Sequence, residues 1–542
     1  MTQSSQSPFG TWRTYLWPIH SSELSKFLPL ILMAFFISFN YNILRNLKDS
    51  LVVTAESSGA EVIPFIKVWV LLPMALLMTF LFTRLVNKYP REKVFYILIT
   101  IFLGFFFLFT FVLYPARSYL HPHAAADLLQ NILPEGLKGF VAMFRYWTFT
   151  GFYVLAELWG NIILSVLFWG FANEVTKVVE AKRFYGLIGI GCNFSGVAAG
   201  QISILISPTV FNTSIPFGND AWEQSLMMST IAVLLSGVII VAVFRWLNKN
   251  VISHQENLER AAIKLSKQKE EPKVKLSMRQ NFAYLAQSRY LIGIAMVVLC
   301  YNLVINLTEV VWKAQVKELY PNTNDYYTYM SQISTITGII ATLTALFISG
   351  NSLRKCGWTF TALIPPVILL VTSVGFFSFL LFKFQLAGIV ALIGTTPLAM
   401  AVLFGSAQNC LSRASKYTLF DATKELSFIP LDRESKLKGK AAIDGVGSRL
   451  GKSGGSIVYQ GLLVVFGTLS ATTPYVAGIL MGAIGVWILA VKSLGKRFTE
   501  LVGHHESLHI AHGEQVQVST EPIPEEAVAA AAAETPASPI TA

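Results

Sequence analysis

The sequence contains few charged residues and only four cysteines. Asp, Glu, Lys and Arg make up 13% of its 542 residues, whereas 53% are hydrophobic and the mean hydropathy is +0.54. Soluble proteins carry about 25% charged residues, so this composition excludes a water-soluble protein. The cysteines are scattered at positions 192, 300, 356 and 410, and this spacing indicates neither a disulfide framework nor a metal site. We expect no metal and no cofactor.

The chain also lacks a complete P-loop, although "RLGKSGGS" at 449–456 is similar to one. The pattern G-x-x-x-x-G-K-[ST] places its first glycine five residues before the second, so that backbone amides surround one phosphate. Val446 occupies that position here, and no β-branched run precedes it. The sequence therefore does not predict nucleotide hydrolysis, and Lys452 needs another role.

The apolar residues gather in long runs. A helix needs about 20 apolar residues to cross the hydrocarbon core of a membrane, and we identify twelve runs of this kind. They predict an all-α polytopic membrane protein with twelve transmembrane helices. The runs cover residues 27–45, 62–82, 94–114, 145–172, 184–206, 222–245, 290–311, 326–349, 359–382, 386–411, 441–468 and 474–491.

The N-terminal sequence and the charges in the loops predict how the chain is placed in the membrane. "MTQSSQSPFGTWRTYLWPIH" has no uninterrupted apolar core before a small-residue cleavage site, so we expect no signal peptide. Lys and Arg concentrate in the loops after the even-numbered runs, which predicts that both termini are cytoplasmic. The net charge of +11 thus reflects topology and not a nucleic-acid partner. The predicted parts are an N-terminus (1–26), a first half (27–246), a charged central loop (247–288), a second half (289–492) and a cytoplasmic tail (493–542), disordered from about residue 514.

The two halves share short sequence repeats. "YNILRNLKD" at 41–49 is similar to "YNLVINLTE" at 301–309. A second match, at nearly the same offset, pairs Glu180, Lys182, Gly191 and Gly200 with Glu434, Lys436, Gly445 and Gly454. Two repeats of six helices are the plan of major-facilitator-like carriers, which bind substrate at mid-membrane between the halves. We therefore predict this architecture.

We single out four of the charged residues that lie inside the predicted spans. Lys67 stands in "VIPFIKVWV", Glu157 in "VLAELWG", Glu309 in "INLTEVV" and Lys452 in the eleventh run. Because a charge in mid-span costs about 2.5–3.5 kcal/mol on insertion scales, each should face a cavity or a partner. We interpret these residues as a substrate site. In the alternative interpretation, Lys67 with Glu157, or Glu309 with Lys452, forms an ion pair that only holds the halves closed.

Two of the predicted spans carry a polar stripe. Polar residues that recur at intervals of three or four lie on one face of a helix. These residues are Asn302, Asn306, Glu309 and Lys313 on the seventh predicted helix, and Asn42, Asn46 and Asp49 on the first, the last of them just beyond the ends of the two runs. We add Asn42 and Asn306 to the predicted substrate site, because amides can hydrogen-bond a polar substrate.

Lysines buried among asparagines and aromatic residues suit a multiply charged anion. The Lys ammonium group offers a point charge to phosphate. The glycines beside Lys452 would let backbone amides approach the same ligand. Aromatic rings and side-chain amides could hold a base. Nucleotides, sugar phosphates and other organic anions all fit this chemistry.

Several long motifs resemble those of the nucleotide transporter (ATP/ADP translocase) family of plastids and obligate intracellular bacteria. The motifs are "FNYNILR", "GAEVIPFIKVW", "AELWGNIILSVLFWGFANE", "EAKRFYGLIGIGCN", "INLTEVVWK", "LFDATKELSFIPLD" and "KGKAAIDGVGSRLGKSGGS", and the resemblance runs from "WPIH" at 17 to "AVKSLGKRF" at 490. It implies a multi-pass carrier of a bacterial inner membrane or plastid inner envelope. It also implies transport roles for Lys67, Glu157, Glu309 and Lys452. Family members exchange ATP for ADP, import nucleotides with protons, or carry NAD.

The chain departs from the exchangers of this family at two positions. Asn46 in "LRNLKD" replaces an acid of L-R-D-T-K-D, and Tyr459 in "KSGGSIVYQ" replaces a Gln. Either change could alter base preference or coupling. We favour exchange of ATP for ADP across the lipid bilayer. The alternatives are NAD/ADP exchange and net import of nucleoside triphosphates with protons, for which Glu309 is the candidate proton carrier.

Two other classes of protein fit less well. A membrane-embedded phosphotransferase would need clustered carboxylates to hold metal ions, and a channel would need rings of like charge. The acids in the predicted spans are isolated from one another in sequence. We therefore expect a monomeric secondary transporter and not an enzyme.

Overall fold

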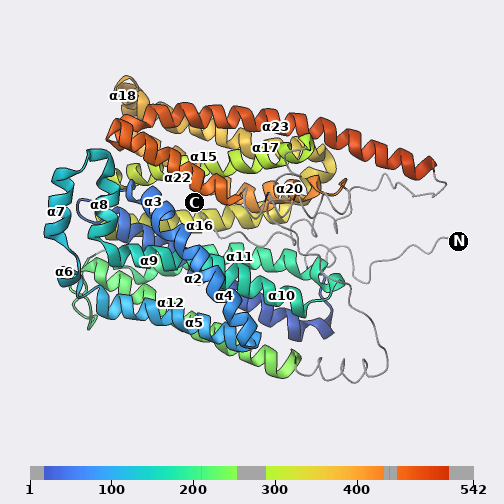
Figure 1. The fold of residues 1–542 in the computed structure, drawn as a ribbon, viewed down its shortest axis with the longest axis horizontal. Helices are drawn as coiled ribbons and strands as arrows, with labels where there is room; N and C mark the ends of the chain where they lie inside the picture. Colours follow the sequence, from blue (N-terminus) through green and yellow to red (C-terminus); the bar gives the residue numbers. More distant parts are fainter. Residues whose placement is uncertain are drawn as a thin grey trace.

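The structure is a computed structural model, and it describes residues 17–208, 210–252, 288–431, 439, 443 and 448–511. Within these ranges the regular structure is helical, and the long helices run roughly parallel in one bundle (Figure 1). Ten helices in the described part are long and apolar enough to cross a membrane, or eleven if the bent pair Lys383–Leu392 and Pro397–Ser427 is one crossing. The predicted all-α polytopic class is confirmed, whereas the count of twelve crossings is not.

The first predicted half contributes the helices nearest the N-terminus. Three short helices, α6 (Arg117–Leu120), α7 (His123–Ile132) and α8 (Lys138–Arg145), lie together at one end of the bundle, which we call the α7 end (Figure 1). The longer elements are α2 (Leu24–Val53), α3 (Val62–Phe65), η2 (Ile66–Leu71), α4 (Leu72–Lys88), α5 (Arg91–Leu108), α9 (Trp147–Leu158), η5 (Trp159–Phe168), α10 (Trp169–Val175), α11 (Val178–Ile206) and α12 (Ala221–Leu247).

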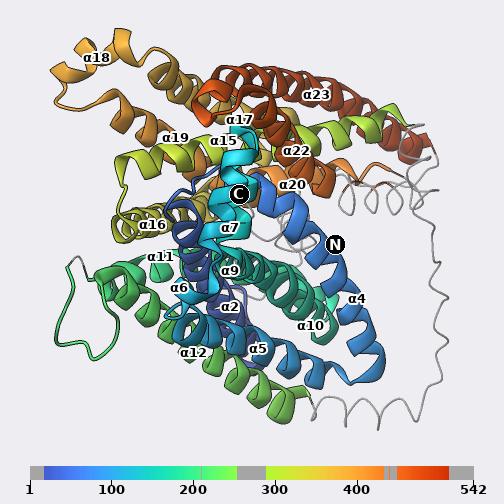
Figure 2. The same cartoon turned by 60° about the vertical axis from the view of Figure 1, so that its left-hand side comes forward.

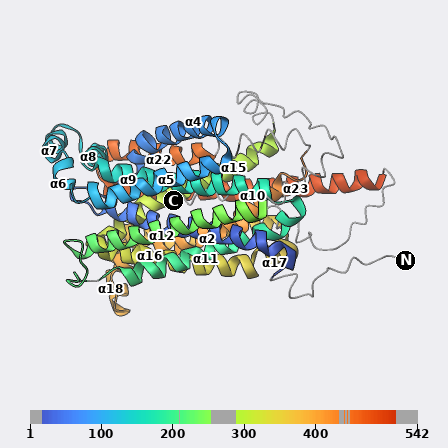
Figure 3. The same ribbon diagram turned by 90° about the horizontal axis from the view of Figure 1, so that it is seen from below.

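The second predicted half contributes the remaining helices. They are α15 (Arg289–Leu319), α16 (Thr323–Phe347), α17 (Ser349–Leu381), α18 (Lys383–Leu392), α19 (Pro397–Ser415), α20 (Asp421–Ser427), α22 (Ser448–Phe466) and α23 (Leu469–Ala511). Figure 3 shows that α23 extends beyond the bundle at the end opposite α7. Most of the predicted central loop, the start of the eleventh run and the tail after Ala511 lie outside the described residues.

Side chains at the helix starts explain several boundaries. The first backbone N–H groups of a helix have no partner within it, and Asp, Asn and Ser side chains can accept from them. Asp220 accepts from the amide of Glu223 at 2.7 Å at the start of α12. Asn322 accepts from the amide of Asn324 at 2.8 Å at the start of α16. These helices therefore begin where a polar residue follows a loop.

The outer surface of the bundle is strongly apolar. Phe80, Leu235, Val371 and Leu489, on four different helices, are 62–67% exposed. Soluble monomers rarely expose large apolar patches, whereas lipid tails cover such side chains in a membrane. The surface therefore agrees with the membrane location that the composition predicts.

Helices α11 and α16 join the two predicted halves along a close packing seam, and they lie side by side in Figures 1 and 2. A methyl group added at Gly200 would lie 2.9 Å from the backbone nitrogen of Thr335, and one at Gly338 would lie 2.8 Å from that of Val197. Only glycine permits backbones to approach this closely. Toward the other end of α11, added methyl groups at Gly186 and Gly189 would meet no described atom within 4 Å.

This difference gives a matched pair of substitutions in α11. Alanine in place of a glycine inside a helix normally stabilises by about 0.5–1 kcal/mol. At Gly200 the added methyl group clashes with the α16 backbone, and overpacking costs about 1–3 kcal/mol. We expect Gly200→Ala to lower the unfolding temperature of the purified protein and Gly189→Ala to leave it unchanged or raise it. Equal stability of the two variants would show that the seam tolerates extra volume.

Polar contacts between the halves lie toward the α7 end. The hydroxyls of Thr54 and Thr323 are hydrogen-bonded at 2.8 Å. Lys317 donates to the carbonyl oxygen of Ser58 at 2.6 Å, and Gln460 donates to that of Pro64 at 2.8 Å. The described halves are thus joined at this end.

Candidate functional site

Lys67 and Glu309, predicted from the sequence as site residues, meet at the boundary between the halves. Lys67 lies on η2, and Glu309 lies on α15. The Lys67 ammonium donates to Glu309 Oε2 at 2.9 Å and to Asn306 Oδ1 at 2.9 Å. Asn306 lies one turn before Glu309, so one face of α15 presents both acceptors. The structure therefore brings three predicted site residues together.

A second ion pair crosses the boundary in the opposite direction. Lys313, one turn after Glu309, contacts the Glu309 carboxylate and also pairs with Asp49 Oδ2 on α2 at 2.8 Å. In the first pair the lysine belongs to the first half, and in this pair it belongs to the second. Asp49 and Glu309 close the two repeated sequence segments, so equivalent positions of the repeats supply the two acids.

Glu157 has a different partner from the one considered in the sequence. Its carboxylate lies 3.7 Å from the ammonium of Lys48, which also donates to Asp49 Oδ1 at 3.0 Å. The same ammonium lies 3.8 Å from the centre of the Tyr153 ring, a cation–π contact. Glu157 and Tyr153 are both fully buried, and within the described residues neither Glu157 oxygen nor the Tyr153 hydroxyl has a hydrogen-bond partner. These groups retain unused capacity for hydrogen bonds.

These ionic contacts form one buried group, which we call the central charged cluster. Each of its six members is at most 8% exposed. Removing an ion from water is costly unless partners compensate its charge, and here three ammonium groups face three carboxylates. The members are Lys48, Asp49, Lys67, Glu157, Glu309 and Lys313.

The remaining predicted site residues lie elsewhere or outside the description. Asn42 donates to the carbonyl oxygen of Ser38 at 2.9 Å and to Ser195 Oγ on α11 at 3.5 Å. Asn42 is therefore engaged in packing between α2 and α11 and makes no described contact with the cluster. Lys452 belongs to α22, but its side chain lies outside the described residues, so its predicted pairing with Glu309 is not tested.

The glycines beside Lys452 have a packing role that the sequence did not reveal. A methyl group added at Gly451 would lie 2.8 Å from Asn302 Cβ, and one at Gly455 would lie 3.1 Å from Asn306 Cβ. Both glycines therefore allow α22 to approach the polar stripe of α15. The glycines beside Lys452 thus serve a close approach between two helices, and their predicted approach to a phosphate stays a prediction.

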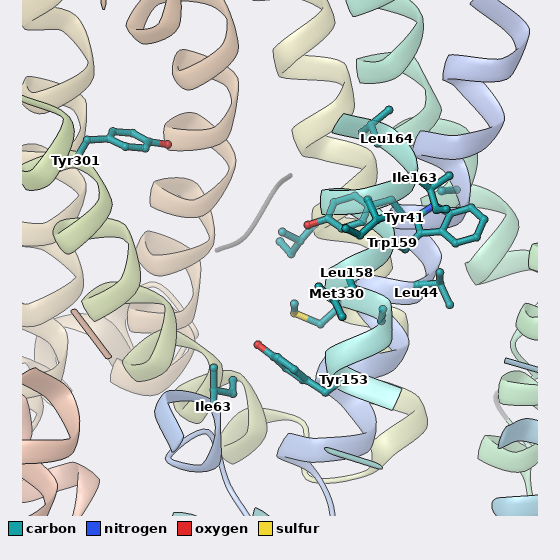
Figure 4. Packing of buried hydrophobic residues seen from close by; sticks show 14 of the residues in the cluster. Tyr41, Leu44, Ile63, Tyr153, Leu158, Trp159, Ile163, Leu164, Tyr301 and Met330 are labelled. Carbon is teal, nitrogen blue, oxygen red and sulfur yellow. The ribbon is translucent and has the colours of Figure 1, made fainter. Parts of the chain in front are cut away.

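Aromatic side chains face one another across the boundary between the halves. In Figure 4 the hydroxyls of Tyr41 and Tyr153 point toward the helices of the second half, and Tyr301 points back from that side. Tyr301 is held by stacking on Phe420, at a ring-centre distance of 4.3 Å. Rigid rings of this kind offer flat surfaces against which a base can stack.

Three members of the cluster, Lys48, Asp49 and Lys313, were not predicted as site residues, although Asp49 and Lys313 were named on the polar stripes. Lys313 was visible on the polar stripe, four residues after Glu309, and that spacing is the signal for an ion pair within a helix. Lys48 was hidden because the first predicted run ends at residue 45, whereas α2 continues to Val53. Extending the run by two turns would have placed both Lys48 and Asp49 inside the span.

Comparison with known proteins identifies the family. The model of the TLC ATP/ADP transporter family matches residues 2–498. ADP,ATP carrier protein 1 of Chlamydia pneumoniae is 48% identical, over 92% of this chain and 96% of its own length. The plastidic ATP/ADP-transporter of Solanum tuberosum is 44% identical, over 88% of this chain and 74% of its own length.

A solved structure supports the fold independently of sequence. An inward-facing bacterial homologue of the iron transporter ferroportin matches with a TM-score of 0.52 at 13% identity, over 88% of this chain and 99% of its own. This likeness concerns the fold alone and confirms the predicted major-facilitator-like class. The named relatives are carriers, in agreement with the prediction that the chain is not an enzyme. With a family model that covers nearly the whole chain and relatives at 44–48% identity, the protein belongs to the TLC ATP/ADP transporter family.

Proposed function

We propose that this protein exchanges ATP for ADP by alternating access, and that the central charged cluster binds the phosphate groups. The observation that carries the proposal is the pair of buried ion pairs, Lys67–Glu309 and Lys313–Asp49, that cross between the halves. The names of the Chlamydia and plastid relatives, which are ADP,ATP carriers, support the same substrates.

Phosphate chemistry explains why these ion pairs suit a carrier. A nucleotide phosphate is a stronger and more highly charged acceptor than a single carboxylate. When it enters, it replaces Glu309 or Asp49 as the partner of Lys67 and Lys313. Each replacement breaks a contact that joins the halves. Binding and movement of the halves are thereby linked, and Lys452 on α22 is a further candidate ligand.

The position of the contacts between the halves, combined with the predicted topology, indicates which side of the membrane the carrier is closed to. The described contacts between the halves concentrate toward the α7 end. With both termini cytoplasmic, as the Lys and Arg distribution predicts, this closed end faces away from the cytoplasm. We assign the structure to an inward-facing state, in a bacterial inner membrane or a plastid inner envelope.

Glu157 and Tyr153 are assigned to the nucleoside. Glu157 carries a buried carboxylate that accepts no hydrogen bond from a described residue, and a carboxylate can accept from several donors at once. The adenine amino group and the ribose hydroxyls are neutral donors, so they can approach it without the repulsion that a phosphate would meet. Tyr153, one turn earlier on α9, offers its ring and hydroxyl beside the same ligand.

Nucleotide analogues test the role of Glu157. A hydrogen bond to a charged group contributes about 1.5–3 kcal/mol. We therefore expect the wild-type carrier to bind ADP at least about 10-fold more tightly than it binds at least one of three analogues: 2′-deoxy-ADP, 3′-deoxy-ADP and IDP. Competition against labelled ADP measures this preference. Glu157→Gln should reduce it, whereas Glu180→Gln, which removes another acid paired with a lysine (Lys26), should preserve it. Equal binding of all four nucleotides by wild type would refute the assignment.

Proton-coupled import remains the second candidate because of Asn46. In the structure Asn46 donates a hydrogen bond to the hydroxyl of Ser334 on α16 at 3.1 Å, so its side chain forms a contact between the halves. Glu309, the candidate proton carrier, contacts both Lys67 and Lys313, and both would have to leave it before it could carry a proton. This arrangement, like the names of the relatives, favours exchange.

One transport assay separates the two functions. Purified protein is placed in lipid vesicles that are either empty or loaded with ADP, and uptake of labelled ATP is measured with and without a proton uncoupler. Exchange predicts uptake only into ADP-loaded vesicles and no effect of the uncoupler. Uptake into empty vesicles that collapses with the uncoupler would establish symport, and absence of uptake under every condition would refute nucleotide transport by this chain.

A further inference from the structure

Helix α18 is an additional element that the sequence did not predict. The tenth apolar run, 386–411, was expected to form one crossing. Instead, α18 (Lys383–Leu392) is bent by 92° from the following segment, Pro397–Ser427. Figures 1 and 3 show α18 at the α7 end, and Figure 2 shows it projecting from the bundle.

The sequence between the two helices encodes this break. Gly394 has a φ of +72°, in the left-handed region that glycine adopts without strain. Pro397 opens α19 and cannot continue a preceding helix, because it has no backbone N–H. Thr396 accepts a hydrogen bond from the amide of Ala399 at 3.1 Å and so caps the new helix. The bend is therefore a built feature of the chain.

The surface of α18 is apolar and almost entirely uncovered by protein. Phe384 and Leu392 are 82% and 86% exposed, Ile389 is 65% exposed, and Val390 is the one buried residue of the helix. A helix with this sequence, "KFQLAGIVAL", would be unfavourable in water, because contact between apolar surface and water is unfavourable. The surroundings of α18 must therefore supply an apolar phase.

The neighbouring helices indicate where α18 lies relative to the membrane. The segments on either side, Lys355–Leu381 and Pro397–Ser427, have 27 and 31 residues, and each exceeds the roughly 20 residues that a crossing needs. The crossings are thus complete without α18, which runs across the direction of the second segment. The two residues that join α18 to α17, Leu381 and Phe382, are also apolar and exposed.

We propose that α18 lies flat in the interfacial layer of the bilayer at the α7 end, with its apolar side chains among the upper parts of the lipid tails. Helices that lie in the membrane plane bury their apolar side chains about 5–10 Å into the boundary between headgroups and lipid tails. Lys383, at the start of the helix and exposed, can extend its ammonium group to the headgroups. The partner of this surface is lipid, and α18 fixes the depth of the α17–α19 connection.

A spin-label scan in lipid vesicles tests this proposal. Single cysteines are placed in turn at residues 383–393 of the full chain, after replacement of its four native cysteines. Collision of each label with oxygen, which enters lipid, is compared with collision with a water-soluble nickel chelate. An interfacial helix predicts an oxygen-to-nickel ratio that oscillates with a period of about 3.6 residues around a constant mean. Its maxima should exceed, several-fold, the ratio at Tyr119, which is 92% exposed on α6.

Each other arrangement gives a different profile. A helix that crosses the membrane predicts a ratio that rises steadily along the chain, a helix in water predicts nickel collision as frequent as at Tyr119, and a second copy packed on α18 predicts low collision with both reagents. Any of these profiles would overturn the proposal. If removal of all native cysteines prevents folding, a background that keeps the buried Cys300 and Cys410 can be used. The result does not depend on transport, so it stands apart from the proposed exchange function.

Discussion

Replacement of Lys67 by methionine is expected to abolish exchange of ATP for ADP while the protein still folds and inserts. Folding should survive because Glu309 keeps its contact with Lys313. Binding should fail because the cluster then carries an unpaired negative charge at the place where we propose that the phosphates bind. Removing one partner of a buried charge pair costs about 2–5 kcal/mol, so we expect exchange to fall at least about 30-fold.

A double variant separates contact from charge in this prediction. Lys67→Met with Glu309→Gln removes both members of the pair and restores neutrality in the cluster. If Lys67 touches phosphate, the double variant stays inactive. Recovery of exchange by the double variant would mean that only charge balance matters at this position. If the single Lys67→Met variant exchanged nucleotides at a rate within a few-fold of wild type, Lys67 would not belong to the binding site. Membrane insertion and thermal unfolding provide the control for correct folding.

A disulfide between residues 54 and 323 is expected to stop transport completely and reversibly. The hydroxyls of Thr54 and Thr323 lie 2.8 Å apart on different halves, close to the α7 end. Cysteines at neighbouring positions of this kind can form a disulfide when their Cβ atoms are about 3.5–4.5 Å apart. Thr54→Cys with Thr323→Cys should therefore lock the present state, with more than about 90% loss of exchange on oxidation. Reductant should restore activity.

The single variants are the controls for this experiment, since each adds one thiol and neither can form the cross-link. Exchange by the single variants should be insensitive to oxidation. Cross-linking must be confirmed by mass, because an unformed bond would leave activity unchanged for a trivial reason. If fully cross-linked protein still exchanged nucleotides, the halves would not need to part at Thr54 and Thr323, and alternating access through this end would be wrong.

The helices were largely predictable from the sequence because length and hydrophobicity decide whether a segment crosses a membrane. The exception, 386–411, fails for a local reason, since Gly394 and Pro397 stand inside the apolar run and divide it. A window average hides two such residues among many apolar ones. The two helix-breaking residues therefore encode the break in the sequence itself.

The pairing of the charges was less predictable. The cost of burying a charge identified Lys67, Glu157 and Glu309 as candidate site residues, but it could not predict which charges form ion pairs. Lys67 and Glu309 are 242 residues apart in the chain, and their contact depends on how far each helix extends and how it is rotated against its neighbours. The sequence therefore indicated which residues matter and left the network itself to the structure.

The equal numbers of positive and negative members in the central charged cluster affect the energetics of transport under voltage. These six residues together carry no net charge, so the membrane potential does little work on them when the empty protein changes state. The potential then acts mainly on the bound nucleotide. Exchange of ATP for ADP moves one extra negative charge, which corresponds to about 2.3 kcal/mol per 100 mV, or roughly a 40-fold bias in concentration ratio. A polarised membrane would thereby give direction to an exchange whose chemistry is otherwise symmetrical.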